Sequence, residues 1–157
     1  MDMLFLLFNI ATDAYAIPAD RVREVIPNVP LRACPAAPAY IAGLLNYHGK
    51  ITPVVDLCRL LTPSGCAPAL STRIMLVTYT ARDGRERLLG LAAETVTNML
   101  EKREADFSER GIVNTEAPFL GAIACENGQT LQCIHVERML PAEIEALLFN
   151  ETGEDVR

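Results

Sequence analysis

A stretch in the first half of the chain recurs in weaker form 79 residues later, and this internal repeat limits the possible folds more than any other feature. When residues 39–61 are placed on residues 118–140, the apolar and turn positions coincide although few residues are identical. The coinciding pairs include Tyr40 with Phe119, Gly49 with Gly128 and Leu61 with Leu140. A second pair of similar segments, 15–26 and 89–100, occurs in the same order at a slightly smaller offset. Two repeats in the same order predict one β-rich unit used twice.

Composition bounds the size and the class of the protein. The 157 residues are enough for one domain or two small β subdomains with a common core, and half of them are hydrophobic. The net charge is −6 and basic residues do not cluster, which argues against a nucleic-acid interface. The five cysteines are odd in number and form no CxxC motif, so we predict free thiols in a reducing cytoplasm.

The apolar N-terminus is interpreted as a strand. A signal peptide needs a basic residue ahead of its apolar run, whereas Asp2 is the only charge before Met3–Phe8. The run is also much shorter than a membrane span. We therefore predict a soluble, cytoplasmic protein that does not insert into the membrane.

Turn residues predict three β-hairpins. Their tips are His48-Gly49, Asp83-Gly84 and Asn127-Gly128. Asp56 is expected to cap a short helix over Leu57–Leu61. A C-terminal helix is expected after Pro141, docked through Ile144, Leu147 and Leu148. We expect a surface loop over 101–116 and a frayed tail over 150–157.

Motifs for catalysis and for cofactor binding are missing. The sequence contains no GxSxG element and no glycine-rich phosphate loop. Its two histidines, His48 and His135, have spacings to the cysteines that match no usual zinc pattern. His135 precedes a predicted short helix, where capping or packing explains it better than metal ligation does. We expect no enzymatic activity, no cofactor and no metal, and a small Cys/His-dependent enzyme is the weakest alternative.

Apolar residues near predicted turns have two interpretations that the sequence leaves open. Val22, Val25 and Ile26 in the first copy, and Val96 and Met99 in the second, are most simply core residues. Some of them alternatively line a groove between the halves that accepts a partner helix.

The order of several motifs resembles the CheW family of chemotaxis coupling proteins over about residues 3–149. The motifs are Tyr15-Ala-Ile-Pro, Val22-Arg-Glu-Val25, Pro35-x-x-Pro38-x-Tyr-Ile-x-Gly43, Leu45-Asn-Tyr-His-Gly49, Pro53-Val-Val-Asp-Leu57 and Gly90-Leu-x-x-Glu-x-Val96. The resemblance implies a mainly β fold of two SH3-like five-stranded barrels on a shared core, with short helices and a C-terminal helix. We place the subdomains at about 15–70 and 71–149, with the N-terminal strand and the C-terminal helix packing across them.

The same resemblance implies a role and partners. Family members are scaffolds or adaptors that couple the cytoplasmic tips of chemoreceptors to the regulatory domain of the histidine kinase CheA in membrane receptor arrays. A CheW-like domain that serves another output module of an accessory pathway is the alternative.

Seven residues are predicted to contact partners. Val22, Glu24, Gly43 and Asn46 match family segments that contact partners or lead into the hairpin, and Val96 and Met99 come from the apolar sets. His48 stands where the family usually has arginine, which carries a permanent charge. A contact made by histidine is expected to depend on pH, unless His48 is only a turn residue.

Overall fold

The computed structural model describes residues 2–62, 70–103, 106–108, 117–126 and 128–149. Strands dominate this part of the chain. The strands are β1 (Asp2–Ile10), β2 (Asp13–Pro18), β3 (Val22–Pro27), β4 (Ile41–Tyr47), β5 (Lys50–Asp56), β6 (Arg73–Thr80), β7 (Glu86–Ala93), β8 (Thr95–Arg103), β9 (Phe107–Ser108), β10 (Leu120–Glu126) and β11 (Gln129–Ile134). The helices are η1 (Ala19–Arg21), α1 (Leu57–Leu61), η3 (Val136–Arg138) and α2 (Ala142–Leu148). The predicted mainly β class is confirmed.

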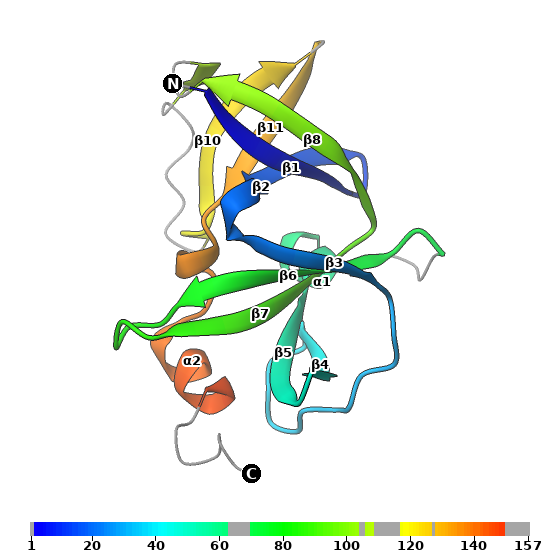
Figure 1. Cartoon of the computed structure of the whole chain (residues 1–157), viewed down its shortest axis with the longest axis vertical. Helices are drawn as coiled ribbons and strands as arrows, with labels where there is room; N and C mark the ends of the chain where they lie inside the picture. The colour runs from blue at the N-terminus through cyan, green and yellow to red at the C-terminus, as the bar shows by residue number, and fades with distance from the viewer. Residues whose placement is uncertain (1, 63–69, 104–105, 109–116, 127, 150–157) are drawn as a thin grey trace.

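The strands form two sheets, one toward each end of the molecule (Figure 1). One sheet has six strands in the order β8-β1-β2-β11-β10-β9, and the other has five in the order β3-β6-β7-β5-β4. If the short β9 is left out, the two orders correspond strand for strand. In this correspondence β8, β1, β2, β11 and β10 of one sheet take the places of β3, β6, β7, β5 and β4 of the other. The five-stranded units that the family resemblance implies are therefore present, with β9 as an added edge.

The two repeats exchange strands. The similar segments found in the sequence make β3 the counterpart of β8, β4 that of β10 and β5 that of β11. Yet β3, β4 and β5 of the first copy pair with β6 and β7 of the second, while β8, β10 and β11 join β1 and β2. Residues 22–93 thus supply one whole sheet. The division that we placed at residues 70 and 71 falls inside that sheet, between its strands β5 and β6.

Local geometry supports the repeat. Tyr47 is opposite Lys50 and Glu126 is opposite Gln129, so both hairpins have two-residue loops. His48 and Gly49 have φ values of 51° and 87°, as a type I′ turn requires. The backbone N–H of Asp56 donates to the Tyr40 carbonyl, and the equivalent His135 N–H donates to Phe119, each over 2.7 Å.

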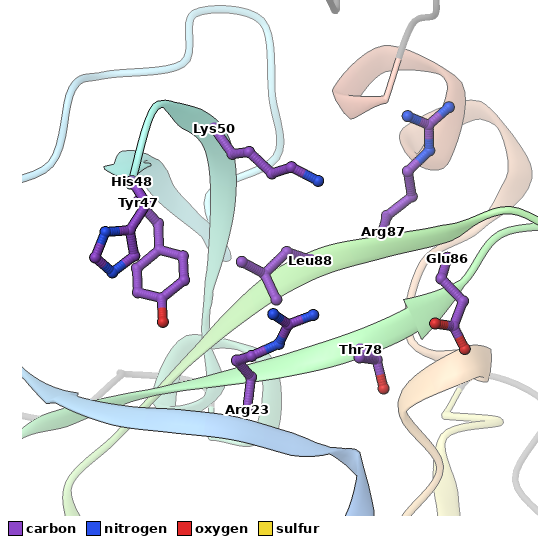
Figure 2. Close-up of a pocket in the computed structure, with 8 residues that line it drawn as sticks. All are labelled: Arg23, Tyr47, His48, Lys50, Thr78, Glu86, Arg87 and Leu88. Atoms are coloured by element: carbon purple, nitrogen blue, oxygen red, sulfur yellow. The ribbon is translucent and has the colours of Figure 1, made fainter.

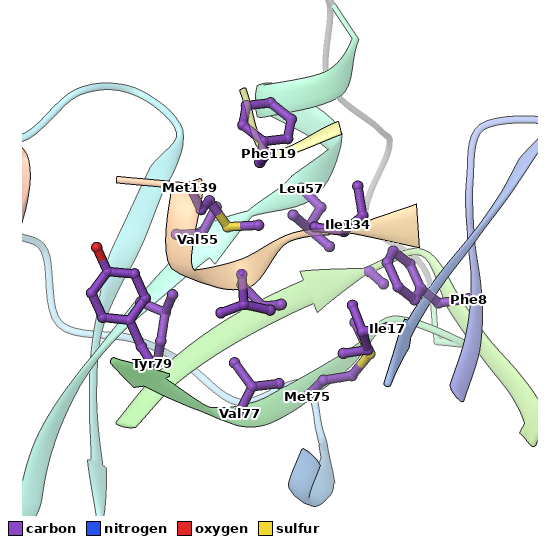
Figure 3. Packing of buried hydrophobic residues seen from close by; sticks show 14 of the residues in the cluster. Phe8, Ile17, Val55, Leu57, Met75, Val77, Tyr79, Phe119, Ile134 and Met139 are labelled. Atoms are coloured by element: carbon purple, nitrogen blue, oxygen red, sulfur yellow. The ribbon is translucent and has the colours of Figure 1, made fainter. Parts of the chain in front are cut away.

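Each sheet has one face in a common core and the other in a small core of its own. The common core contains Phe8, Ile17, Met75 and Val77 from both sheets (Figure 3). A second cluster around Leu45 and Leu76 fills the five-stranded barrel, and a third around Phe5, Ala16 and Leu131 fills the six-stranded one. The shared core that the sequence predicted is confirmed.

Several local predictions needed correction. Residues 101–103 continue β8 and 107–108 form β9, so they are not loop. Leu147 is exposed and does not dock, whereas Ile144 and Leu148 pack on the common core. Cys58 is disulfide-bonded, and free thiols are found at Cys34, Cys125 and Cys133. The predicted tail 150–157 lies outside the described residues.

No helix in the described ranges is long and apolar enough to cross a membrane.

Candidate functional site

A hollow of about 250 Å³ opens beside the tip of the β4–β5 hairpin. We call it the hairpin-tip hollow. Its walls come from β3, β6, β7 and the hairpin itself, so it lies at one end of the five-stranded barrel (Figure 2). The lining residues are Arg23, Tyr47, His48, Lys50, Thr78, Glu86, Arg87 and Leu88.

Local sequence builds the hairpin tip. Left-handed backbone at His48 and Gly49 makes the tight turn, and the Asn46 side-chain oxygen accepts a hydrogen bond from the Gly49 N–H over 2.9 Å. The rings of Tyr47 and His48 meet edge to face, with centroids 4.4 Å apart.

A hydrogen bond ties the tip to the edge strand β3. The Tyr47 hydroxyl donates to the Glu24 carboxylate, and this hydrogen bond is the main reason that the pKa of Tyr47 is raised. Because Glu24 and Tyr47 are far apart in sequence, this contact depends on the tertiary fold.

Positive charge surrounds the hollow. Arg23, Lys50 and Arg87 line it, and within the described ranges none of them forms an ion pair. The guanidinium of Arg87 lies 5.8 Å from the centre of the Phe149 ring, and its Nε is buried without a hydrogen-bond partner. Glu86 is the one carboxylate among the lining residues. The hollow can therefore attract an anionic group.

The structure groups some of the predicted contact residues. Glu24 and His48 are exposed near the hollow, and Asn46 is exposed while its side chain supports the turn. Gly43 is buried, and a methyl group there would lie 2.7 Å from the Arg32 carbonyl oxygen, so its role is structural. Val22 is partly buried against the common core.

The second-copy residues lie elsewhere. Val96 and Met99 are on β8, an edge strand of the six-stranded sheet. Val96 packs against the common core, whereas Met99 is 50% exposed.

Sequence reasoning predicted His48 alone among the eight lining residues, and the seven that it missed include Arg23, Tyr47, Lys50 and Arg87. A signal existed for the first three, because Arg23 precedes Glu24 and the other two flank the predicted turn. Arg87 offered no signal, since its position depends on the parallel pairing of β5 with β7.

Metal ligation gains no support from the described part of the chain. No group of three or more His, Cys, Asp or Glu side chains there is arranged to hold a metal. His135 makes no side-chain cap bond, and its ring packs close against Gly121. Of the two roles considered for His135, packing is observed and capping is not.

Comparisons with known proteins agree with this architecture. The crystal structure of the scaffolding protein TtCheW from Thermoanaerobacter tengcongensis is similar, with a TM-score of 0.79 at 22% identity over 92% of this chain and 91% of that one. A model of the CheW-like domain matches residues 4–143. The chain belongs to the CheW-like domain family. This family places the protein among the scaffold or adaptor proteins of chemotaxis signalling.

Individual relatives support the same assignment. The chemotaxis protein CheW of Rhizobium meliloti is 22% identical over 138 residues, which cover 87% of this chain and 86% of that protein. The chemotaxis protein CheW of Klebsiella aerogenes is 23% identical over 93% of this chain and 86% of its own length.

Proposed function

We propose that this protein is a non-catalytic adaptor that couples the cytoplasmic tips of chemoreceptors to the regulatory domain of a CheA-type histidine kinase. The observation that carries the proposal is the CheW-like match over residues 4–143. The adaptor acts in the cytoplasm and is recruited to membrane receptor arrays by the receptors, without inserting into the membrane itself. It binds neither nucleic acid nor a cofactor.

The fold suits simultaneous binding of two partners. The exposed candidate residues lie at two separate places, with Glu24 and His48 near the hairpin tip and Met99 on the outer edge of β8. A rigid body that holds one partner at each place can transmit a shift in one to the other. Val22, Gly43 and Val96 support these surfaces from behind rather than by contact.

A direct test uses Glu24. The variant Glu24→Lys removes the acceptor of the Tyr47 hydroxyl and reverses an exposed charge, so we expect weaker partner binding with folding intact. Wild type should bind the kinase regulatory domain of its own organism with roughly micromolar affinity. Calorimetric titrations with that domain and with a soluble receptor tip measure both interactions.

Glu143→Lys is the matched control, because it makes the same charge change at an exposed position of α2. Unchanged affinity of Glu24→Lys for both partners would remove Glu24 from the binding surface. Failure of wild type to bind either partner would contradict the adaptor role.

His48 gives a second test. Arg23, Lys50 and Glu86 line the same hollow, Tyr47 beside it bonds to Glu24, and histidine is the side chain whose charge most readily changes near neutral pH. If the receptor surface is acidic, binding should strengthen between about pH 7.5 and 6, and His48→Arg should remove that dependence. A receptor adapted to neutral histidine should bind the arginine variant less well. Equal affinities in all four measurements would mean that His48 only shapes the turn.

The departure at His48 also favours the alternative output module. A domain without the usual arginine can serve a partner other than a standard kinase. In that case the receptor tip would bind and the CheA-type domain would not.

A further inference from the structure

We propose that the hairpin-tip hollow binds an acidic peptide segment of a partner, through a carboxylate that enters between Arg23, Lys50 and Arg87. The inference rests on the proposed function only in that the occupant is a protein segment. It adds a site and a ligand chemistry that the predicted contact residues do not include.

The first argument is charge. The whole chain has a net charge of −6, yet three basic side chains and one carboxylate line this hollow, which leaves a local excess of two positive charges, 3 − 1. Elsewhere Arg21 and Arg82 are paired with Glu137 and Glu145, whereas the three basic residues of the hollow have no such partner in the described ranges. Clefts lined by charge of one sign concentrate ligands of the opposite sign.

The second argument is hydrogen bonding. Within the described residues the buried Nε of Arg87 has no hydrogen-bond partner, and its guanidinium lies over the Phe149 ring. A buried donor without a partner is unfavourable. A small turn of the side chain toward an incoming carboxylate would offer the paired N–H donors that match carboxylate geometry.

The third argument is size and polarity. A volume of about 250 Å³ equals the liquid volume of about eight water molecules, which suits one or two side chains and not a folded element. Leu88 and the Tyr47 ring give the hollow an apolar side that inorganic phosphate cannot use. An acidic residue next to an aliphatic one satisfies both parts of the lining. The Tyr47 hydroxyl already engages Glu24, which reduces the repulsion from that carboxylate.

Calorimetric titration of the full-length protein with short peptides tests the proposal. The probe is an acetylated and amidated peptide of sequence Glu-Leu-Glu-Glu, and the comparison peptide has glutamine at each glutamate position. At pH 7.5 and about 50 mM salt we expect the acidic peptide to bind at least tenfold more tightly than the glutamine peptide. Raising the salt to about 300 mM should weaken that binding several-fold, because the charges are partly exposed.

Variants of the lining residues locate the site. Arg23→Gln and Lys50→Gln should each weaken binding about threefold or more, while Glu86→Gln should strengthen it about threefold by removing the repelling carboxylate. Arg59→Gln is the matched control, since it removes one positive charge from an exposed position of α1 outside the hollow and should change affinity less than about twofold. Because Glu86→Gln predicts a gain, a misfolded variant cannot imitate the result.

Three outcomes would overturn the proposal. The first is equal binding of both peptides, or of neither. The second is an equal loss in Arg59→Gln. The third is inorganic phosphate that binds as tightly as the acidic peptide and responds to the same variants, which would make the hollow a site for small anions. The peptide titration contains no receptor or kinase, so its failure would not contradict the adaptor role. If the peptide binds but the receptor tip and the kinase domain do not, the adaptor role alone is contradicted.

Discussion

At the scale of single residues, Gly43 shows how a motif position can be structural. Its φ of 154° is one that side chains rarely adopt, and the register of β4 with β5 shifts between Ile41 and this residue. A Cβ here would approach the Leu31 Cβ to 2.8 Å as well as the Arg32 carbonyl oxygen. Gly43 therefore allows the segment before β4 to pack on the strand.

We expect Gly43→Ala to lower the free energy of unfolding by about 2–3 kcal/mol, because it combines backbone strain with overlap against main chain. Gly84→Ala is the comparison. It shares a positive φ, 85°, but a methyl group there meets nothing within 4 Å, so its cost should be about 1 kcal/mol. Urea denaturation followed by circular dichroism measures both, and equal losses would contradict the packing argument.

Cys133 and Cys125 give a second prediction at this scale. Burial raises the pKa of the Cys133 thiol to about 11, whereas Cys125 is exposed. A raised pKa keeps the thiol protonated, so at pH 8 only about one Cys133 in a thousand is the reactive thiolate. Iodoacetamide at pH 8 should modify Cys125 at least tenfold faster, as read by peptide mass spectrometry. In urea, where both cysteines are exposed, the two rates should become similar. Similar rates already in the native protein would show that burial does not protect Cys133.

At the residue scale, the sequence predicted only features that depend on neighbours in the chain. The Asp56 cap was predicted, and its carboxylate accepts from the backbone N–H groups of Cys58 and Arg59. The positive φ of His48 was predicted for the same reason, since turn chemistry depends on neighbours in the chain. The Glu24–Tyr47 hydrogen bond and the unpaired Arg87 were not predictable, because both need strands that meet only after folding.

At the scale of elements, α2 is held by one carboxylate. Glu145 accepts from the hydroxyl of buried Tyr79 over 2.6 Å, and from the N–H and the guanidinium of Arg82 over 3.0 and 2.9 Å. Burial, with the Glu145 hydrogen bond second, raises the pKa of Tyr79. The Tyr79 and Phe149 rings also stack, with centroids 5.7 Å apart. The helix thus joins the β6–β7 hairpin to the end of the described chain.

Glu145→Ala should destabilise the protein by about 2 kcal/mol, since it leaves the Tyr79 hydroxyl without its acceptor. For a chain of this length the melting temperature should fall by about 4–8 °C. Glu143→Ala, on the same helix and exposed, should change stability by less than about 0.5 kcal/mol. Thermal denaturation followed by circular dichroism compares them. An equally large loss of stability in Glu143→Ala would mean that the negative charge near the start of the helix, and not the bond to Tyr79, causes the effect.

The hairpins were predictable as elements and their sheet partners were not. Residues that turn a hairpin are adjacent in sequence, so three tips were located correctly. The choice of β6 rather than β2 as the neighbour of β3 involves residues far apart, with Val25 opposite Met75. Because both repeats have similar apolar patterns, the sequence does not distinguish pairing within a repeat from exchange between repeats.

At the scale of the whole molecule, exchange and the common core bind the two sheets into one unit. Buried residues from β1 and β2 in one sheet and from β6 and β7 in the other belong to a single cluster. Neither sheet can lose its partner without exposing that face to water.

We therefore expect one cooperative unfolding transition. Circular dichroism of the strands and tyrosine fluorescence, recorded in the same urea series, should give coincident midpoints. Two separated transitions would show that the sheets unfold as independent units despite the shared cluster.

The strand exchange also sets an order of events during synthesis. The chain leaves the ribosome from its N-terminus, so β1 and β2 emerge before the other strands, yet their sheet needs β8, β10 and β11, which emerge only after every strand of the five-stranded sheet. The five-stranded sheet needs only residues 22–93 and has all its strands once β7 has emerged. Until β8, β10 and β11 emerge, the β1–β2 hairpin lacks its sheet neighbours, and apolar Phe8 and Ile17 face an incomplete common core. The six-stranded end of the molecule closes only after β11 has emerged.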